Sequence, residues 1–164
     1  MKLHNVLTLS TLAGSLFALA PQAYADNDQG IDFNTGPNSL AVTSISITTP
    51  NVLATVTATC PQAGFLFATA SSQFNVTPGV VNGAQFLYSL AKDATGVDNA
   101  TRYDVVIREI TSLSFLPASS LMRVDSCSAG QSVTYRFVAV KGVDVSKLTA
   151  VRPKLVVTFS QAKI

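Results

Sequence analysis

Imidazole and indole side chains are almost absent from this 164-residue chain, which has one histidine and no tryptophan. The histidine, His4, lies in an N-terminal stretch that has the pattern of a secretory leader. Without an imidazole in the rest of the chain, Ser–His–Asp and Cys–His catalysis are excluded, because both need it as the base. The lack of tryptophan also counts against a strong sugar-stacking site.

Charged residues are scarce too: Glu109 is the single glutamate, and the formal net charge is only +2. This balance predicts no electrostatic attraction to nucleic acid or to an anionic membrane. There is no Gly-rich phosphate loop, and two cysteines without a histidine make an incomplete zinc shell. We therefore expect no cofactor, no zinc and no nucleic-acid partner.

Residues 1–25 have the pattern of a signal peptide. Lys2 supplies a positive charge, residues 6–20 form an apolar run, and residues 23–25 read Ala-Tyr-Ala, a cleavage signal. The run is too short and too rich in small residues to make a good bilayer span. We expect the remainder to be secreted or periplasmic, with no membrane insertion after cleavage.

The chain after the leader divides into two parts. Residues 26–38 are polar and contain glycine and proline, which predicts a flexible N-terminal lead-in. Residues 39–164 have the length of one domain with a proper core, and we expect them to form a β-sandwich.

Cys60 and Cys127 are the only cysteines. An even pair in an exported chain predicts one disulfide, and two buried free thiols are the alternative. A bond that closes so long a loop would contribute about 4 kcal/mol of stability in the chain-entropy model.

Apolar residues alternate with polar ones over residues 52–60. Every second residue from Val52 to Cys60 therefore lies on one face of the predicted strand. A Pro-Gln-Ala-Gly turn leads into residues 65–70, which are apolar on both faces and predict a central strand. Residues 133–139 and 155–159 alternate as residues 52–60 do.

Two stretches fit this scheme less simply. The apolar residues of 40–49 change parity halfway, which predicts a bulge or a change of partner strand, and residues 144–149 would allow a short helical turn. No long segment has a helical period, and turn signals recur about every 8–12 residues. The sequence therefore predicts an all-β fold, an antiparallel β-sandwich of jelly-roll type with about eight to ten short strands and one disulfide.

Two segments resemble a known family. V-L-A-T-V-T-A-T-C-P-Q-A-G-F-L-F-A-T-A (52–70) and R-V-D-S-C-S-A-G-Q-S-V-T-Y-R-F-V-A-V-K-G (123–142), with P-K-L-V-V-T-F-S (153–160), resemble the jelly roll of complement and tumour-necrosis-factor-like domains in bacterial secreted proteins. The resemblance covers about half of the chain after the leader. It implies a non-catalytic, often trimeric protein that binds through loops or outer faces.

The chain is also similar to chaperone-assembled pilus subunits in its length, its export, its cysteine pair and its alternating strands. Those subunits usually carry an aromatic residue near the C-terminus, where this chain has Gln-Ala-Lys-Ile (161–164). This similarity implies assembly through a donated strand.

Several acids gather around the polar loop 92–101; they are Asp93, Asp98, Asp104 and Glu109. A carboxylate-based hydrolase would need two of them about 5–9 Å apart in a cleft. Asp93, Asp98 and Asn99 are weak candidates for calcium ligands. Because acids in polar turns are more often surface turn formers, we expect no catalytic residue and no metal here.

Other polar groups lie on the predicted strands. Arg123 and Asp125 share one side of an extended segment, which predicts a local ion pair or part of a polar binding patch. Tyr88, Tyr103 and Tyr135 lie on apolar faces, where we expect them in the core or at a sheet edge.

The sequence thus predicts an exported, non-catalytic β-sandwich protein with a structural or binding role at the cell surface, in the periplasm or in the medium. Its partner would be a second copy of the chain, a cell-surface protein or a glycan. Two alternatives stay open: a pilus or adhesin-like subunit assembled through strand exchange, and a carboxylate-based hydrolase. The sequence assigns no ligand-binding residues.

Overall fold

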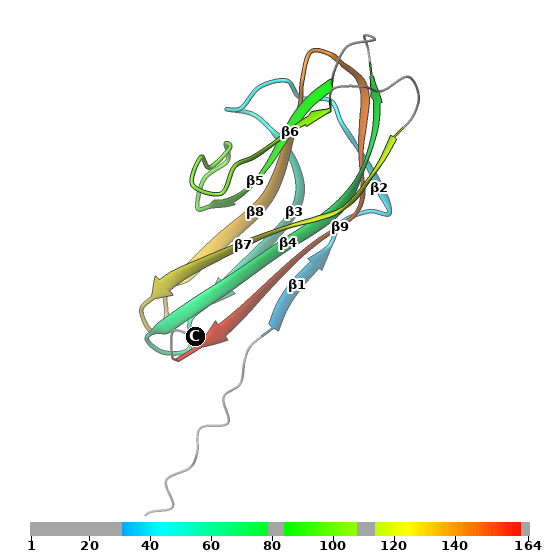
Figure 1. Cartoon of the computed structure of the whole chain (residues 1–164). Helices are drawn as coiled ribbons and strands as arrows, with labels where there is room; N and C mark the ends of the chain where they lie inside the picture. The colour runs from blue at the N-terminus through cyan, green and yellow to red at the C-terminus, as the bar shows by residue number, and fades with distance from the viewer. Residues whose placement is uncertain (1–30, 79–83, 108–113, 162–164) are drawn as a thin grey trace, which may run out of the picture.

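The structure, a computed structural model, describes residues 31–78, 84–107 and 114–161, and every regular element in these ranges is a strand (Figure 1). The nine strands are β1 (Ile31–Thr35), β2 (Ser39–Val42), β3 (Asn51–Thr59), β4 (Gly64–Pro78), β5 (Ala84–Lys92), β6 (Tyr103–Ile107), β7 (Ser114–Cys127), β8 (Ser132–Lys141) and β9 (Val145–Ser160). The described residues form no helix that is long and apolar enough to cross a membrane. The predicted all-β class is confirmed.

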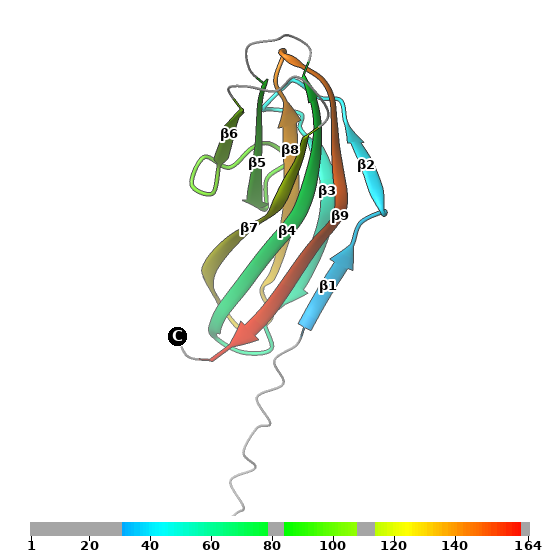
Figure 2. The ribbon, with the colours of Figure 1, turned by 45° about the vertical axis from the view of Figure 1, so that its right-hand side comes forward.

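The strands form two antiparallel sheets that pack face to face, with sheet A in front of sheet B in Figure 2. Sheet A has the order β1-β9-β4-β7, with β2 also paired to β9, and sheet B has the order β3-β8-β5-β6. When β1 and β2 are counted as one interrupted strand, this is the strand order of a jelly roll. The predicted jelly-roll sandwich is confirmed.

Period-2 alternation places the core between the sheets as the sequence predicts. The inward residues of β8 are Val133, Tyr135, Phe137 and Ala139, and all are fully buried. Phe74 of β4 meets Phe86 and Tyr88 of β5 with ring centroids 5.0 and 5.3 Å apart. Aromatic pairs of this kind contribute about 0.5–1.5 kcal/mol each beyond their burial, so these rings join the two sheets.

β3 begins with a bulge that the sequence does not reveal. Leu53 and Ala54 are both buried, whereas Val52 is exposed, because the register with β8 shifts between Val52 and Ala54. The prediction that Val52 faces inward is therefore wrong. From Ala54 onward the predicted alternation holds, and Cys60 is buried at the end of the strand.

Three strands of sheet A are longer than the sequence suggests: β4 has 15 residues, β7 has 14 and β9 has 16. β4 continues through a bulge near Ser72, and β7 continues through Pro117, because β7 is an edge strand, where a proline does not break the sheet. The short helical turn expected within 144–149 is wrong, because β9 begins at Val145. Conversely, the strand expected over 40–49 ends at Val42.

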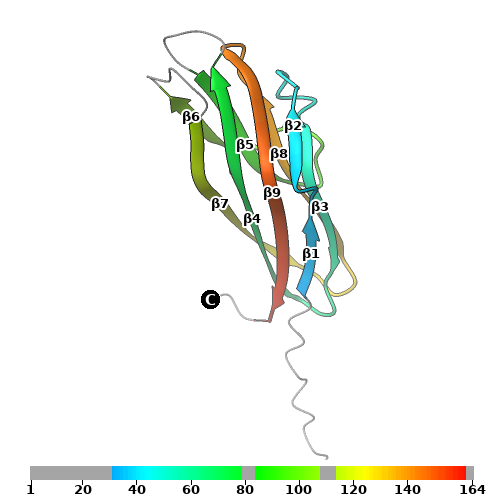
Figure 3. The same ribbon diagram turned by 90° about the vertical axis from the view of Figure 1, so that its right-hand side faces the viewer.

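The expected lead-in is partly a strand. β1 lies within residues 26–38, and β1 and β2 follow one another along the edge of β9 (Figure 3). They are interrupted at Gly36, whose N–H donates to Pro153 O at 2.9 Å, opposite a bulge in β9. A Cβ at Gly36 would lie 2.5 Å from Leu53 O, so only glycine fits at this close approach between the chain and β3. Residues 26–30 and the expected signal peptide, 1–25, lie outside the described residues.

A disulfide joins the two sheets at one end of the sandwich. Cys60 follows β3 of sheet B, and Cys127 is the last residue of β7 in sheet A. The bond links positions 67 residues apart in the chain, with the Cα atoms 6.4 Å apart. The predicted pairing is confirmed, and it connects strands that do not pair with each other.

We expect a Cys60→Ser/Cys127→Ser variant to lose up to about 4 kcal/mol of unfolding free energy, because the bond no longer restricts the unfolded chain. Urea unfolding of the oxidised wild type, the reduced wild type and the variant measures this. The reduced wild type should coincide with the variant. Equal midpoints for the oxidised wild type and the variant would show that the bond contributes nothing.

Candidate functional site

A polar network lies beside the disulfide, inside an otherwise apolar sandwich. Its members are Lys92 at the end of β5, Asp98 in the loop 93–102, Arg123 and Asp125 of β7, and Tyr135 of β8. Arg123 and Asp125 share the inward parity of β7 with Cys127, whereas the neighbouring Met122 and Val124 face solvent. The polar network therefore joins β7 of sheet A to β5 and β8 of sheet B.

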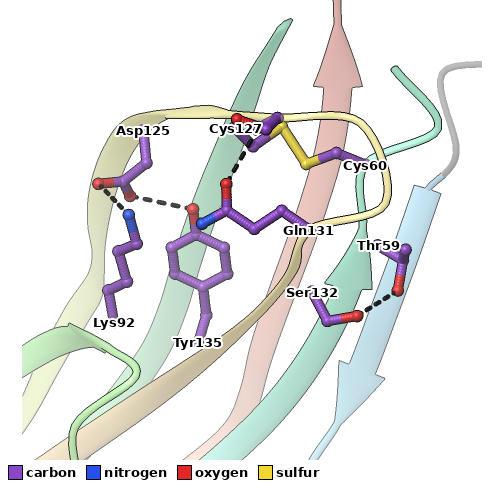
Figure 4. The surroundings of a disulfide bond; sticks show 9 residues. Thr59, Cys60, Lys92, Asp125, Cys127, Gln131, Ser132 and Tyr135 are labelled. Atoms are coloured by element: carbon purple, nitrogen blue, oxygen red, sulfur yellow. Dashed lines mark hydrogen bonds and ion pairs between the residues drawn. A yellow bond between two sulfur atoms is a disulfide. The ribbon is translucent and has the colours of Figure 1, made fainter. Parts of the chain in front are cut away.

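Asp125 is the centre of the polar network, and its side chain is only 13% exposed. Its Oδ2 accepts hydrogen bonds from Arg123 Nε at 2.7 Å and from Tyr135 Oη at 2.9 Å. Its Oδ1 faces Lys92 Nζ at 3.5 Å (Figure 4). Arg123 also pairs with Asp98 through Nη1. The predicted Arg123–Asp125 ion pair is confirmed, but it is half-buried and part of a larger set.

The surroundings shift the pKa values of three members. Burial raises the pKa of Asp125, but hydrogen bonds from Arg123 and Tyr135 and the charge of Lys92 outweigh it, so the pKa lies below its ordinary value. Burial, together with the charge of Asp125, raises the pKa of Tyr135 far above that of a free tyrosine. The hydrogen bond to Asp125 raises the pKa of Arg123.

These shifts fix the charges of the polar network across the physiological range. Asp125 stays ionised, Arg123 stays protonated and Tyr135 stays neutral, so none is poised to exchange a proton near pH 7. Both carboxylate oxygens of Asp125 have donors. The polar network therefore holds the sheets together and offers no free acid or base for catalysis.

The acids proposed for calcium binding or hydrolysis are held by different donors. Asp93 Oδ1 accepts from Thr134 N–H at 2.8 Å, Asp98 pairs with Arg123, and Asp104 pairs with Arg102 at 2.7 Å. Asn99 is exposed in the loop. No three acidic, histidine or cysteine side chains in the described ranges are grouped as metal ligands would be. Glu109 lies outside the described residues.

An apolar groove lies on the outer face of sheet B, away from the disulfide. Residues 43–50 cross this face and are fixed to β8 by a hydrogen bond from Lys141 N–H to Ser44 O at 2.8 Å. A second bond, from Val97 N–H to Ile47 O at 2.9 Å, joins them to the loop 93–102. The groove has a volume of about 220 Å³ and is lined by Ile45, Ile47, Gln85, Phe86, Leu87, Arg102, Asp104, Val105, Val106, Val140, Lys141, Gly142 and Val143.

The apolar groove has a buried floor and an exposed rim. Leu87 and Val140 of the floor are buried, although neither belongs to the core between the sheets. On the rim, Ile45 is 62% exposed, Val106 57% and Val143 79%. Exposed aliphatic side chains that line one hollow make it a candidate interaction site.

The charged groups at the apolar groove already have partners. Arg102 Nε and Nη2 donate to the Asp104 carboxylate at 2.7–3.0 Å, and Lys141 Nζ donates to Val145 O at 2.8 Å. The groove therefore offers aliphatic side chains together with a similar share of polar surface, which includes a neutralised ion pair. The sequence did not predict this site; its one signal was the parity change at Ile45 and Ile47, which marks residues that leave the strand.

No family model matches the chain, and no curated protein matches it. Among solved structures, the EclA C-terminal domain, described as a sugar-binding protein, is 15% identical with a TM-score of 0.38, over 74% of this chain and 79% of that chain. Eiger TNF from S. frugiperda is 8% identical with a TM-score of 0.37, over 82% and 94%. The T13 particle of IBDV is 12% identical with a TM-score of 0.38, over 78% and 30%. At these TM-scores the likenesses support no transfer of function to this chain.

We expect Tyr135→Phe to lower the unfolding free energy at pH 7 by about 1–3 kcal/mol, because a hydrogen bond to a buried carboxylate is lost. Since the folded state raises the pKa of Tyr135, the wild type should lose stability above about pH 10, where the unfolded tyrosine ionises and the folded one does not. The variant should show a shallower loss.

The matched control is Tyr103→Phe, because Tyr103 is 54% exposed and outside the polar network. Urea midpoints measured from pH 6 to 11 compare the two variants. Identical pH profiles for both would contradict the assigned role of Tyr135.

Proposed function

We propose that the chain is an exported, non-catalytic binding domain that holds an apolar side chain of a partner protein in the apolar groove. The supporting observation is the exposed rim of Ile45, Val106 and Val143 above a buried floor. Covering one such aliphatic side chain contributes on the order of 1.5–3 kcal/mol. A few contacts of this size are enough for a specific, reversible complex.

The size of the apolar groove favours a protein anchor as the occupant. A volume of about 220 Å³ is below the roughly 300–1,000 Å³ of typical cofactor and small-molecule pockets. It suits one large apolar side chain or two small ones, as at the centre of a protein interface. The Arg102–Asp104 pair at the rim would face the polar border of such an interface.

The edge of sheet B favours an extended segment as the carrier of that side chain. β6 pairs with β5 on one side and, within the described residues, with no strand on the other. Val105 and Val106 of β6 line the groove, so a strand added beside β6 would pass next to it. Strand addition with one side chain in a pocket is a common mode of peptide recognition.

The geometry gives less support to the two alternatives. A pilus-type subunit needs a donated strand, but here β9 lies between β4 and the β1–β2 pair, and the chain's own strands fill the jelly-roll order. A carboxylate-based hydrolase needs two unengaged acids facing one cleft, whereas Asp93, Asp98 and Asp104 each have a separate donor.

Export is supported by the disulfide, which persists in oxidising compartments.

Selection from a phage-displayed library of random peptides tests this proposal. We expect the enriched peptides to share a large apolar residue and to bind the wild type with Kd on the order of 10–100 µM. Val143→Asp should weaken binding by about tenfold or more, because it places a charge on the apolar rim. Fluorescence anisotropy with a labelled peptide measures the affinity.

Met122→Asp is the matched control, because Met122 is 69% exposed on the outer face of sheet A and outside the apolar groove. It should bind the peptide as the wild type does. Equal weakening by both substitutions, or peptides that bind Val143→Asp normally, would rule out the groove. A wild-type dimer that Val143→Asp dissociates would identify the partner as a second copy.

A further inference from the structure

The cations on β9 differ from the other cations in the part of the chain that the structure describes. In the described ranges, Lys92, Arg102 and Arg123 pair with carboxylates, and Arg136 and Lys141 donate to backbone carbonyls. The side chains of Lys147, Arg152 and Lys154 have no hydrogen-bond or ion-pair partner among the described residues. All three are exposed and lie on β9, so three cations without a partner among the described residues share one strand of sheet A.

A row of neutral polar side chains runs beside these cations. Outward-facing residues of β4 are paired with β9 in the register Ser71↔Lys154, Gln73↔Val151, Asn75↔Thr149 and Thr77↔Lys147. We call this surface the β9 lane; it comprises Ser71, Gln73, Asn75 and Thr77 of β4 with Lys147, Thr149, Arg152 and Lys154 of β9. Every β4 member is a hydroxyl or an amide, which can both donate and accept hydrogen bonds.

One polar atom in the β9 lane has no partner. Asn75 Oδ1 is buried and accepts no hydrogen bond within the described part of the chain. A buried acceptor without a donor is costly to the folded chain. Asn75 lies opposite Thr149 of β9 and opposite Phe115 of β7, between the positions of Lys147 and Arg152 along the lane.

Arg152 adds a conformational outlier at the same place. It has φ +50° in the bulge where β9 opposes Ser72, a left-handed conformation that favours glycine over any residue with a Cβ. Strained backbone of this kind is concentrated at functional sites. The guanidinium of Arg152 is exposed, between Lys147 and Lys154 along β9.

No acid among the described residues belongs to the β9 lane. Asp144 precedes β9, and Asp32 belongs to β1. Asp93, Asp98, Asp104 and Asp125 belong to the loop 93–102, β6 and β7, and three of them are paired with cations. The lane is therefore complementary to a negatively charged ligand.

We propose that the β9 lane binds an acidic polysaccharide chain. Ser71 to Thr77 span roughly 20 Å at a strand rise of about 3.3 Å per residue, which fits an extended polymer better than a small anion. The cations would meet its carboxylates, and the hydroxyl and amide row would exchange hydrogen bonds with its sugar hydroxyls. The lane has no aromatic side chain on which nucleic-acid bases could stack, so it suits a polysaccharide better than a single-stranded nucleic acid.

Titration of the folded protein with polygalacturonate, by isothermal calorimetry at low and high salt, tests the proposal. We expect binding that weakens with added salt, and no binding of neutral dextran. Lys147→Gln/Lys154→Gln should weaken binding by about tenfold or more, because two charge-assisted contacts are lost. Arg102→Gln/Arg136→Gln removes the same two charges elsewhere and should bind as the wild type does.

Arg152→Gly gives an independent readout. It should weaken polygalacturonate binding while the melting temperature stays the same or rises, because glycine adopts the left-handed conformation without strain. The proposal is overturned if the wild type does not bind polygalacturonate, or if the control pair weakens binding as much as the lane pair. Tighter binding to duplex DNA or to phosphatidylglycerol vesicles than to polygalacturonate would also overturn it.

Discussion

The bond between Cys60 and Cys127 is the covalent constraint that holds the two sheets together at one end of the sandwich. It joins sheet B to sheet A at one end, where the polar network around Asp125 makes a second connection between the same sheets. The core itself contains many small side chains, among them Ala54, Ala58, Ala68, Ala70, Ala84, Ala139 and Ala150. Large buried side chains such as Phe74, Tyr135 and Phe137 fill the same core, and the disulfide adds a covalent link between the sheets.

Because these links lie at one end and between the sheets, the outer faces are free for other roles. The outer face of sheet B is covered by residues 43–50 and the loop 93–102, which leave the apolar groove at their border. The outer face of sheet A carries the β9 lane, with its unpaired cations and its polar row. Two surfaces of opposite chemistry, one apolar and one cationic, would allow the domain to hold a protein and a polysaccharide at the same time.

Much of the frame could be predicted from the sequence, because strand alternation and cysteine pairing are local or compositional signals. The inward faces of β8 and of β3 after Ala54 follow directly from period 2, and the disulfide follows from an even pair in an exported chain. The bulges at Val52 and Arg152 could not be predicted, since they depend on partners distant in the chain. The apolar groove depends on how residues 43–50 cross sheet B. The near-neutral net charge gave no sign of the β9 lane, because it does not show that Asp98, Asp104 and Asp125 pair with cations on other elements.

We infer that the disulfide and the polar network lock one end of the sandwich, while the outer surfaces stay ordered without that lock. Hydrogen exchange of the oxidised and the reduced protein, followed by mass spectrometry, tests it most directly. Reduction should speed exchange in residues 122–127 and 131–135 around the lock and leave residues 85–87 and 138–142 below the apolar groove protected. Unchanged exchange near Cys127, or an equal increase over the whole chain, would contradict the account.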